Sequence, residues 1–142
     1  MKTILFINGP NLNMLGVREP EIYGTTTLPE IERIVAEEAQ VYKMKIVAFQ
    51  SNHEGAIIDF IQESYRGADG IVINPGAFTH YSYAIRDCIT GTDLKTVEVH
   101  ISDINNREEW RKKSVLSDIC AGVISGQGVE GYVRALDYFK DD

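Results

Sequence analysis

Residues 70–89 read GIVINPGAFTHYSYAIRDCI and hold one complete strand-to-helix unit. The run from Gly70 to Ile73 is apolar and rich in β-branched side chains, as is typical of a strand buried on both faces of a parallel sheet. Asn-Pro-Gly at 74–76 interrupts this run, and the apolar residues from Tyr83 to Ile89 then recur with helical spacing. The stretch therefore predicts one βα unit of an α/β fold.

The same alternation repeats along the whole chain. The predicted strands are Thr3 to Ile7, Lys45 to Phe49, Gly70 to Ile73, Thr96 to Ile101 and Ala121 to Ile124, and the predicted helices are Leu28 to Tyr42, Gly55 to Tyr65, Tyr83 to Ile89 and Val129 to Phe139. This pattern fits a flavodoxin-like, doubly wound, five-stranded parallel sheet of order 2-1-3-4-5 with helices on both faces. We expect a single domain over residues 1–142.

Three short segments predict capped helix starts. Residues 27–30, 51–54 and 106–109 each place Thr, Ser or Asn three residues before a glutamate, which is the capping-box pattern. Segment 51–54 (SNHE) is therefore interpreted as a helix start rather than a ligand site, and His53 receives no catalytic role.

Composition limits the classes of partner. The 142 residues carry a formal charge of −7, which disfavours binding to nucleic acid or to an anionic membrane. The N-terminal apolar run is too short for a signal peptide, and no other run reaches membrane-spanning length. Cys88 and Cys120 have no metal or redox spacing and are interpreted as inert thiols, so we expect a reduced, cytoplasmic protein.

Polar residues gather where the predicted strands end, which is where doubly wound sheets bind ligands. The segment after the first strand, residues 8–24, is about twice the usual βα length and predicts a lid at about 17–25. Asn74 and His80 follow the third strand, and His100 ends the fourth. The three histidines lie on different elements without metal spacing, and no GxSxG turn presents a serine, so the chemistry must come from acid–base groups.

Glu98 and His100 share one face of the fourth strand, because side chains alternate along a strand. The carboxylate can orient the imidazole and favour its protonated form, which prepares a general acid. A histidine that is merely satisfied at a strand end is the alternative. His80 is equally compatible with a first-turn position beside a helix cap at Thr79.

Arg18 and Tyr23 in the predicted lid suggest a base. Tyrosine titrates near pH 10, so it becomes a useful base only where cations lower its pKa by about three units. Arg18 with a second arginine, such as Arg107, would suffice. The alternative is a tyrosine packed in a loop hinge beside an exposed arginine.

Residues 126–131, GQGVEG, match the letters of a dinucleotide fingerprint. The chain ends eleven residues after Gly131, so the next strand and the acidic residue of that fingerprint are missing. We expect instead a tight turn at Gly126 and Gly128, and close helix packing at Gly131.

Six segments together resemble the type II 3-dehydroquinate dehydratases, the type II dehydroquinases. They are NGPNLNMLGVREPEIYG at 8–24, QSNHEG at 50–55, INPGAFTHYSYAIRD at 73–87, EVHIS at 98–102, REEWRKKS at 107–114 and GVISGQGVEGY at 122–132. The resemblance implies a cofactor-free hydro-lyase that converts 3-dehydroquinate to 3-dehydroshikimate, in the shikimate route or in quinate breakdown. It implies an anti elimination through an enolate, with no metal.

The resemblance also implies roles for individual residues. The base falls on Tyr23 and the acid on His100, with Arg18 supporting the base and Asn11 the enolate. The remaining implied residues are Asn74, His80, Ile101, Ser102 and Arg111 for substrate binding, and Asp87 contributed by a neighbouring subunit of a homododecamer built from trimers.

The chain departs from the family pattern at Asp103 and Asn105, where the family often has asparagine and histidine. These two departures bear on the expected subunit contacts and turnover rate, and they leave the expected reaction unchanged. Two other classes share the fold. An FMN-binding electron carrier would need a Ser/Thr-rich phosphate cradle in the first loop, and a phosphoacceptor module would need aspartates where Asn8 and Asn74 stand.

Overall fold

A five-stranded parallel sheet in the order β2-β1-β3-β4-β5 forms the centre of the protein, as predicted. The computed structural model describes residues 1–17 and 19–141, and only the backbone of Tyr23. The strands are β1 (Lys2–Asn8), β2 (Met44–Gln50), β3 (Gly70–Asn74), β4 (Lys95–His100) and β5 (Gly122–Ser125). Each predicted strand boundary lies within one residue of the observed one.

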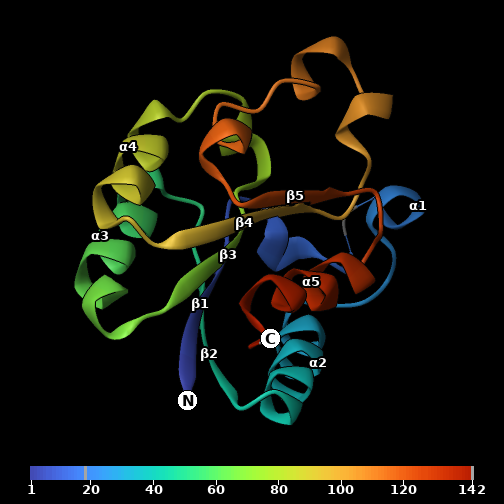
Figure 1. Ribbon diagram of the computed structural model, residues 1–142. Helices are drawn as coiled ribbons and strands as arrows, with labels where there is room; N and C mark the ends of the chain where they lie inside the picture. Colours follow the sequence, from blue (N-terminus) through green and yellow to red (C-terminus); the bar gives the residue numbers. More distant parts are fainter. Residues whose placement is uncertain (18, 142) are drawn as a thin grey trace.

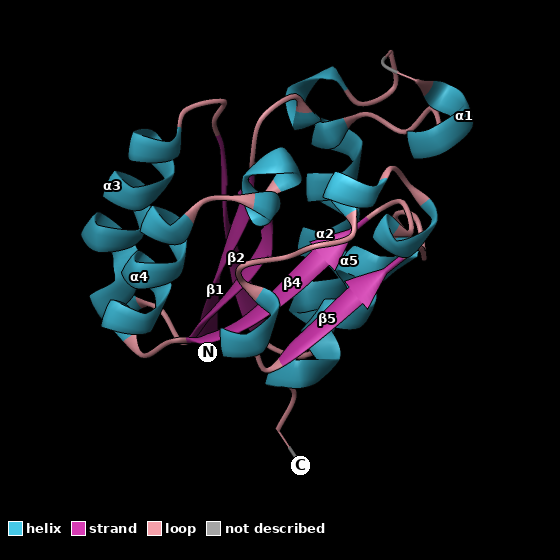
Figure 2. Cartoon of the chain, turned by 90° about the horizontal axis from the view of Figure 1, so that it is seen from above, coloured by secondary structure: helices cyan, strands magenta, loops and turns pink. Residues whose placement is uncertain are grey.

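Helices cover both faces of this sheet (Figures 1 and 2). They are α2 (Leu28–Val41), α3 (Glu54–Ser64), α4 (Tyr83–Thr92) and α5 (Glu130–Ala135), with the single-turn helix α1 (Pro20–Tyr23) in the first loop. One apolar cluster joins α2 and α5 to one face of the sheet, and a second joins α3 and α4 to the other. The doubly wound prediction is therefore confirmed.

The strand register brings polar ends together. Asn8 at the end of β1 pairs with Gln50 of β2 and with Asn74 of β3. The loops that follow β1 and β3 then touch, since the Gly9 amide donates to the Asn74 carbonyl at 2.8 Å. A Cβ at Gly9 would lie 2.4 Å from the Pro75 carbonyl oxygen, so only glycine allows this approach.

One of the three predicted helix caps is confirmed. Thr27 Oγ1 accepts from the Glu30 amide and starts α2. At 51–54 a helix starts as predicted, since α3 begins at Glu54, but the predicted capping box is wrong, because Ser51 Oγ accepts from the His53 amide two residues on. The prediction at 106–109 is also wrong: 3₁₀ turns span Ile104–Asn106 and Glu109–Arg111.

The glycine-rich segment forms a turn and a packing contact, as predicted. Gly126 and Gly128 have φ values of 78° and 60°, which only glycine adopts readily. Gly131 is buried, and a Cβ there would lie 3.2 Å from the Ile124 side chain. The predicted final helix is shorter than expected, because α5 tightens into a 3₁₀ turn at Leu136–Phe139. This turn seats Phe139 over Gly70, where a Cβ would be 2.1 Å from the ring.

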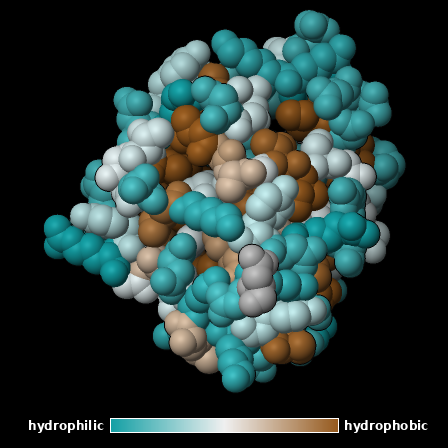
Figure 3. Space-filling view, in the orientation of Figure 1, coloured by the Kyte–Doolittle hydropathy of each residue, from teal (hydrophilic) through white to brown (hydrophobic). Residues whose placement is uncertain are grey.

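The surface is mostly hydrophilic on the face shown in Figure 3, with hydrophobic side chains in separate patches. Among residues 1–17 and 19–141, no helix combines the length and hydrophobicity needed to cross a bilayer.

Candidate active site

A pocket opens at the carboxyl ends of β1, β3 and β4, where the sequence predicted the site. Its walls come from three loops and carry both polar and apolar groups. The lining residues are Pro10, Asn11, Leu12, Asn74, Gly76, Ala77, His80, His100, Ile101, Ser102, Ile104, Arg107 and Arg111. The structure thus brings together seven of the eleven residues proposed from the sequence.

His100 lines this pocket and is only 6% exposed. Its Nε2 lies 2.5 Å from Glu98 Oε2, as expected from the period-two spacing of the two residues. An ionised carboxylate only accepts hydrogen bonds, so Nε2 carries a proton. Nδ1 is then the ring nitrogen that can exchange a proton with a ligand.

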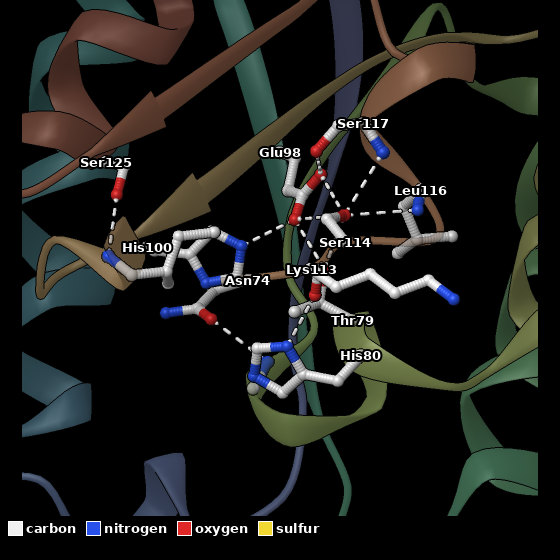
Figure 4. A network of polar contacts seen from close by, with 12 residues as sticks. Asn74, Thr79, His80, Glu98, His100, Lys113, Ser114, Leu116, Ser117 and Ser125 are labelled. Atoms are coloured by element: carbon white, nitrogen blue, oxygen red, sulfur yellow. Dashed lines mark hydrogen bonds and ion pairs between the residues drawn. The ribbon is translucent and has the colours of Figure 1, made fainter. Parts of the chain in front are cut away.

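Glu98 is fully buried behind His100 and receives hydrogen bonds from three hydroxyl groups (Figure 4). Thr79 Oγ1 donates to Oε2 at 2.5 Å, and Ser117 Oγ donates to Oε1 at 2.8 Å. Ser114 Oγ lies 3.0 Å from both oxygens. We call Thr79, Ser114 and Ser117 the hydroxyl cradle.

The cradle and the imidazole decide the charge of this carboxyl. Burial alone would raise the pKa of Glu98, because a charge is disfavoured away from water. The hydrogen bond and charge of His100 and two of the hydroxyl donors outweigh burial, and they hold the pKa of Glu98 below its usual value. Glu98 is therefore an anion at neutral pH.

His80 also lines the pocket and is fixed by its neighbours. Its Nδ1 donates to the Lys113 carbonyl at 2.6 Å, and its ring contacts Trp110 edge-on at 5.2 Å between centroids. Burial lowers the pKa of His80, and the charges of His100 and Arg111 lower it further, against the opposing effect of the Lys113 hydrogen bond. His80 is therefore neutral near pH 7. Its Nδ1 donates to Lys113, so its Nε2 is the nitrogen that can accept a hydrogen bond.

Asn74 is held by a buried tyrosine from α5. Its Nδ2 donates to Tyr132 Oη at 2.8 Å, and that hydroxyl donates to Asn8 Oδ1 at 2.7 Å. Asn74 Oδ1 accepts from the Gly76 amide at 3.1 Å. All of these contacts lock the Asn74 amide in one orientation at the pocket wall.

Two arginines give the pocket positive charge although the chain is acidic. Arg111 lies 4.0 Å from the centroid of the Trp110 ring, and its Nε donates to Glu108 at 2.5 Å. Arg107 Nη1 donates to Ser102 Oγ at 3.1 Å. A guanidinium group is well suited to bind a carboxylate ligand.

Asn11 lies in the first part of the long first loop and has φ of 69°, a left-handed conformation that asparagine tolerates. Its amide donates to Asn52 Oδ1 at 3.0 Å. The QSNHEG segment therefore also positions this loop, a role that the sequence interpretation missed.

Of the other four proposed residues, Glu98 and Asp87 are described and do not line the pocket. Glu98 lies behind His100, and Asp87 is exposed on α4. Arg18 lies outside the described residues, and so does the side chain of Tyr23. The predicted contact between this pair therefore stays a prediction.

The sequence interpretation missed the hydroxyl cradle. Thr79 was considered only as a helix cap, and the serines at 114 and 117 come from an irregular segment without periodicity. In the described part of the chain, no group of three or more His, Cys, Asp or Glu residues could hold a metal ion.

Comparison with known proteins agrees with this fold and site. A family model for class II dehydroquinases matches residues 2–140. The 3-dehydroquinate dehydratase of Caldicellulosiruptor saccharolyticus is 51% identical, and the match covers 99% of this chain and 98% of that protein. Catabolic 3-dehydroquinase 1 of Neosartorya fischeri is 53% identical, and the match covers 96% of this chain and 91% of that protein. The crystal structure of the type II dehydroquinase from Butyrivibrio crossotus has a TM-score of 0.94 at 52% identity, covering 96% of both chains.

The fold, the pocket and these matches define a flavodoxin-like α/β enzyme. The similarity extends over nearly the whole chain and nearly the whole of each relative. The chain belongs to the class II dehydroquinase family. The resemblance noted from the sequence is thus confirmed.

Proposed function

We propose that this chain converts 3-dehydroquinate to 3-dehydroshikimate, with His100 as the general acid. The observation that carries the proposal is the buried Glu98–His100 pair, which presents one imidazole nitrogen to a pocket lined by arginines. Nearly full-length similarity to proteins named 3-dehydroquinate dehydratase supports the choice of substrate.

The proposed reaction is an anti elimination of water. Tyr23, as a tyrosinate supported by Arg18, removes a proton from C2 and leaves an enolate at the neighbouring carbonyl. His100 then protonates the departing C1 hydroxyl, and Asn11 supports the enolate oxygen through water. No cofactor enters this scheme.

The proposed substrate contacts follow the chemistry of the pocket walls. Arg111 and Ser102, with the backbone at Ile101, bind the carboxylate and neighbouring oxygens. The neutral His80 accepts from a substrate hydroxyl, and Asn74 contributes the fixed amide. Residues of about 17–25 close over the substrate as a lid.

We also propose a cytoplasmic homododecamer built from trimers. Asp87 is exposed on α4 and lies outside the pocket, which supports its placement in the site of a neighbouring subunit. Light scattering after size-exclusion chromatography, together with activity of the Asp87→Ala variant, tests this assembly. The pathway is either aromatic biosynthesis or quinate breakdown.

The alternative of an FMN-binding electron carrier is not favoured, because the whole-chain similarity is to dehydroquinases. The decisive assay follows the enone absorbance of 3-dehydroshikimate after metal-free protein is mixed with 3-dehydroquinate. A rise that survives borohydride pretreatment is expected, because no lysine Schiff base takes part. A folded protein that gives no rise would overturn the proposed function.

A further inference from the structure

The carboxylate behind His100 has more hydrogen-bond donors than are needed to orient one imidazole. Glu98 has no exposed surface, yet three hydroxyl groups and the His100 ring surround its two oxygens. The His100 contact alone would fix the ring. The cradle must therefore be explained by its effect on the charge of the carboxylate.

Three hydroxyl donors weaken the pull of the carboxylate on the imidazolium. A bare buried carboxylate would hold that proton strongly, and the histidine would then be a weak acid. Each donated hydrogen bond spreads the negative charge, so that less of it acts on the imidazole. A general acid works best when its pKa is close to the working pH.

We propose that the hydroxyl cradle sets the acid strength of His100 by sharing the negative charge of Glu98. Its three members are positioning residues, since they act through Glu98 and not on the substrate. The inference rests on the proposed function, because it concerns the group that we assign as the acid.

The segment that carries two of these hydroxyls is itself fixed. Ser114 Oγ accepts from the amides of Leu116 and Ser117 at 3.1 Å, and the Val115 amide donates to the Thr79 carbonyl at 2.7 Å. A backbone hydrogen bond therefore links the segment of Ser114 directly to Thr79, and both side chains reach Glu98. Such fixed donors stabilise an anion without having to reorganise.

Other titratable groups near Glu98 do not replace the cradle. His80 is neutral near pH 7, since burial lowers its pKa. Burial raises the pKa of the Cys120 thiol to about 12, so the thiol stays uncharged in the working range.

Thr79→Val tests the proposal, because valine keeps the shape and removes the hydroxyl. Thr96→Val is the matched control: Thr96 is a buried threonine on β4, and its hydroxyl donates to the Leu94 carbonyl at 3.0 Å and not to Glu98. Thr79→Ser keeps a hydroxyl donor at this position and should therefore titrate and turn over like the wild type.

The readout is the titration of the His100 imidazole by NMR in the protein without substrate. The chain has three histidines, so a His100→Ala spectrum assigns the signal. We expect Thr79→Val to raise the pKa of the pair by about one pH unit, while Thr96→Val leaves it unchanged. In parallel, kcat should fall and its alkaline limb should move to higher pH.

A folded Thr79→Val enzyme with reduced turnover but an unchanged His100 titration would overturn the proposal, because that pattern indicates mere misplacement. If Thr79→Val does not fold, Ser117→Ala is the test, because it removes one hydroxyl donor from Glu98 Oε1. An upward shift of the His100 titration would then support the proposal, and no shift would overturn it. The titration needs no turnover. Absence of dehydration by the wild-type protein would therefore count against the proposed function alone.

Discussion

The two sides of the pocket are built in different ways. The acid side lies on β4, where His100 is 6% exposed and Glu98 is fully buried among fixed donors. The side proposed to carry the base is a long loop whose described residues are largely exposed, including Val17 at 74%. The difference indicates that the acid is part of the folded core, whereas a base on the loop can change without disturbing that core.

The sharpest test of this comparison is Tyr23→Phe. The variant should lose nearly all turnover, since phenylalanine cannot take a proton, and it should keep the wild-type melting temperature and substrate affinity. Steady-state kinetics, calorimetric titration with substrate and thermal unfolding check the three expectations. Turnover close to that of the wild type would remove Tyr23 as the base.

His100→Ala is expected to have the next largest effect. Loss of a general acid should lower kcat by about a hundredfold or more. On this side of the pocket stability should also fall, because Glu98 loses the partner that compensates its burial. Urea unfolding alongside the kinetics measures both effects. An unchanged rate would mean that another group protonates the leaving hydroxyl.

Tyr132→Phe tests the rigidity of the pocket wall at the end of β3, where Asn74 lies. The change leaves Asn74 Nδ2 and Asn8 Oδ1 without their buried partner, so the free energy of unfolding should fall by about 1–3 kcal/mol. The exposed Tyr83→Phe on α4 is the matched control and should be neutral. KM should rise only in the Tyr132 variant, because the Asn74 amide is no longer held. Equal stability of the two variants would show that the network does not matter.

The smallest expected effect concerns the pH dependence of stability. The pKa of Glu98 is lower in the folded chain than its usual value, so ionised Glu98 contributes stability above the usual glutamate pKa of about 4.3. That contribution is lost as the pH falls through the lower folded value. Chemical unfolding between pH 6 and pH 3 should therefore show a shallower loss for Glu98→Gln than for the wild type. Identical slopes would contradict the assigned charge.

Much of the fold could be predicted because the strands are apolar runs bounded by turn residues. The runs at 3–7 and 70–73 are almost wholly apolar, and a buried strand of a parallel sheet hydrogen-bonds their backbone while it buries their side chains on both faces. Helix ends were harder to predict. The letters at 106–109 fit a capping box, but the residues after them supply no apolar stripe to hold a helix against the core, and Trp110 is 54% exposed.

The site was predictable in part for the same reason. Glu98 and His100 lie on one strand, where a period of two fixes their relation. Ser114 and Ser117 reach the same carboxylate from an irregular segment, and no local pattern in the sequence marks such a tertiary contact. The loop chemistry only suggested Tyr23 as a base, and the family resemblance selected it, because a tyrosine in a loop has many ordinary explanations.

The burial of Glu98 also bears on how activity returns after unfolding. Besides His100, its partners are Thr79, Ser114 and Ser117, which lie 16 to 19 residues away in sequence, and each must be in place before the carboxylate is satisfied. Non-local contacts of this kind form late in folding. A refolding chain would therefore regain its helical signal before its catalysis, and recovered turnover would report that the last part of the core had assembled.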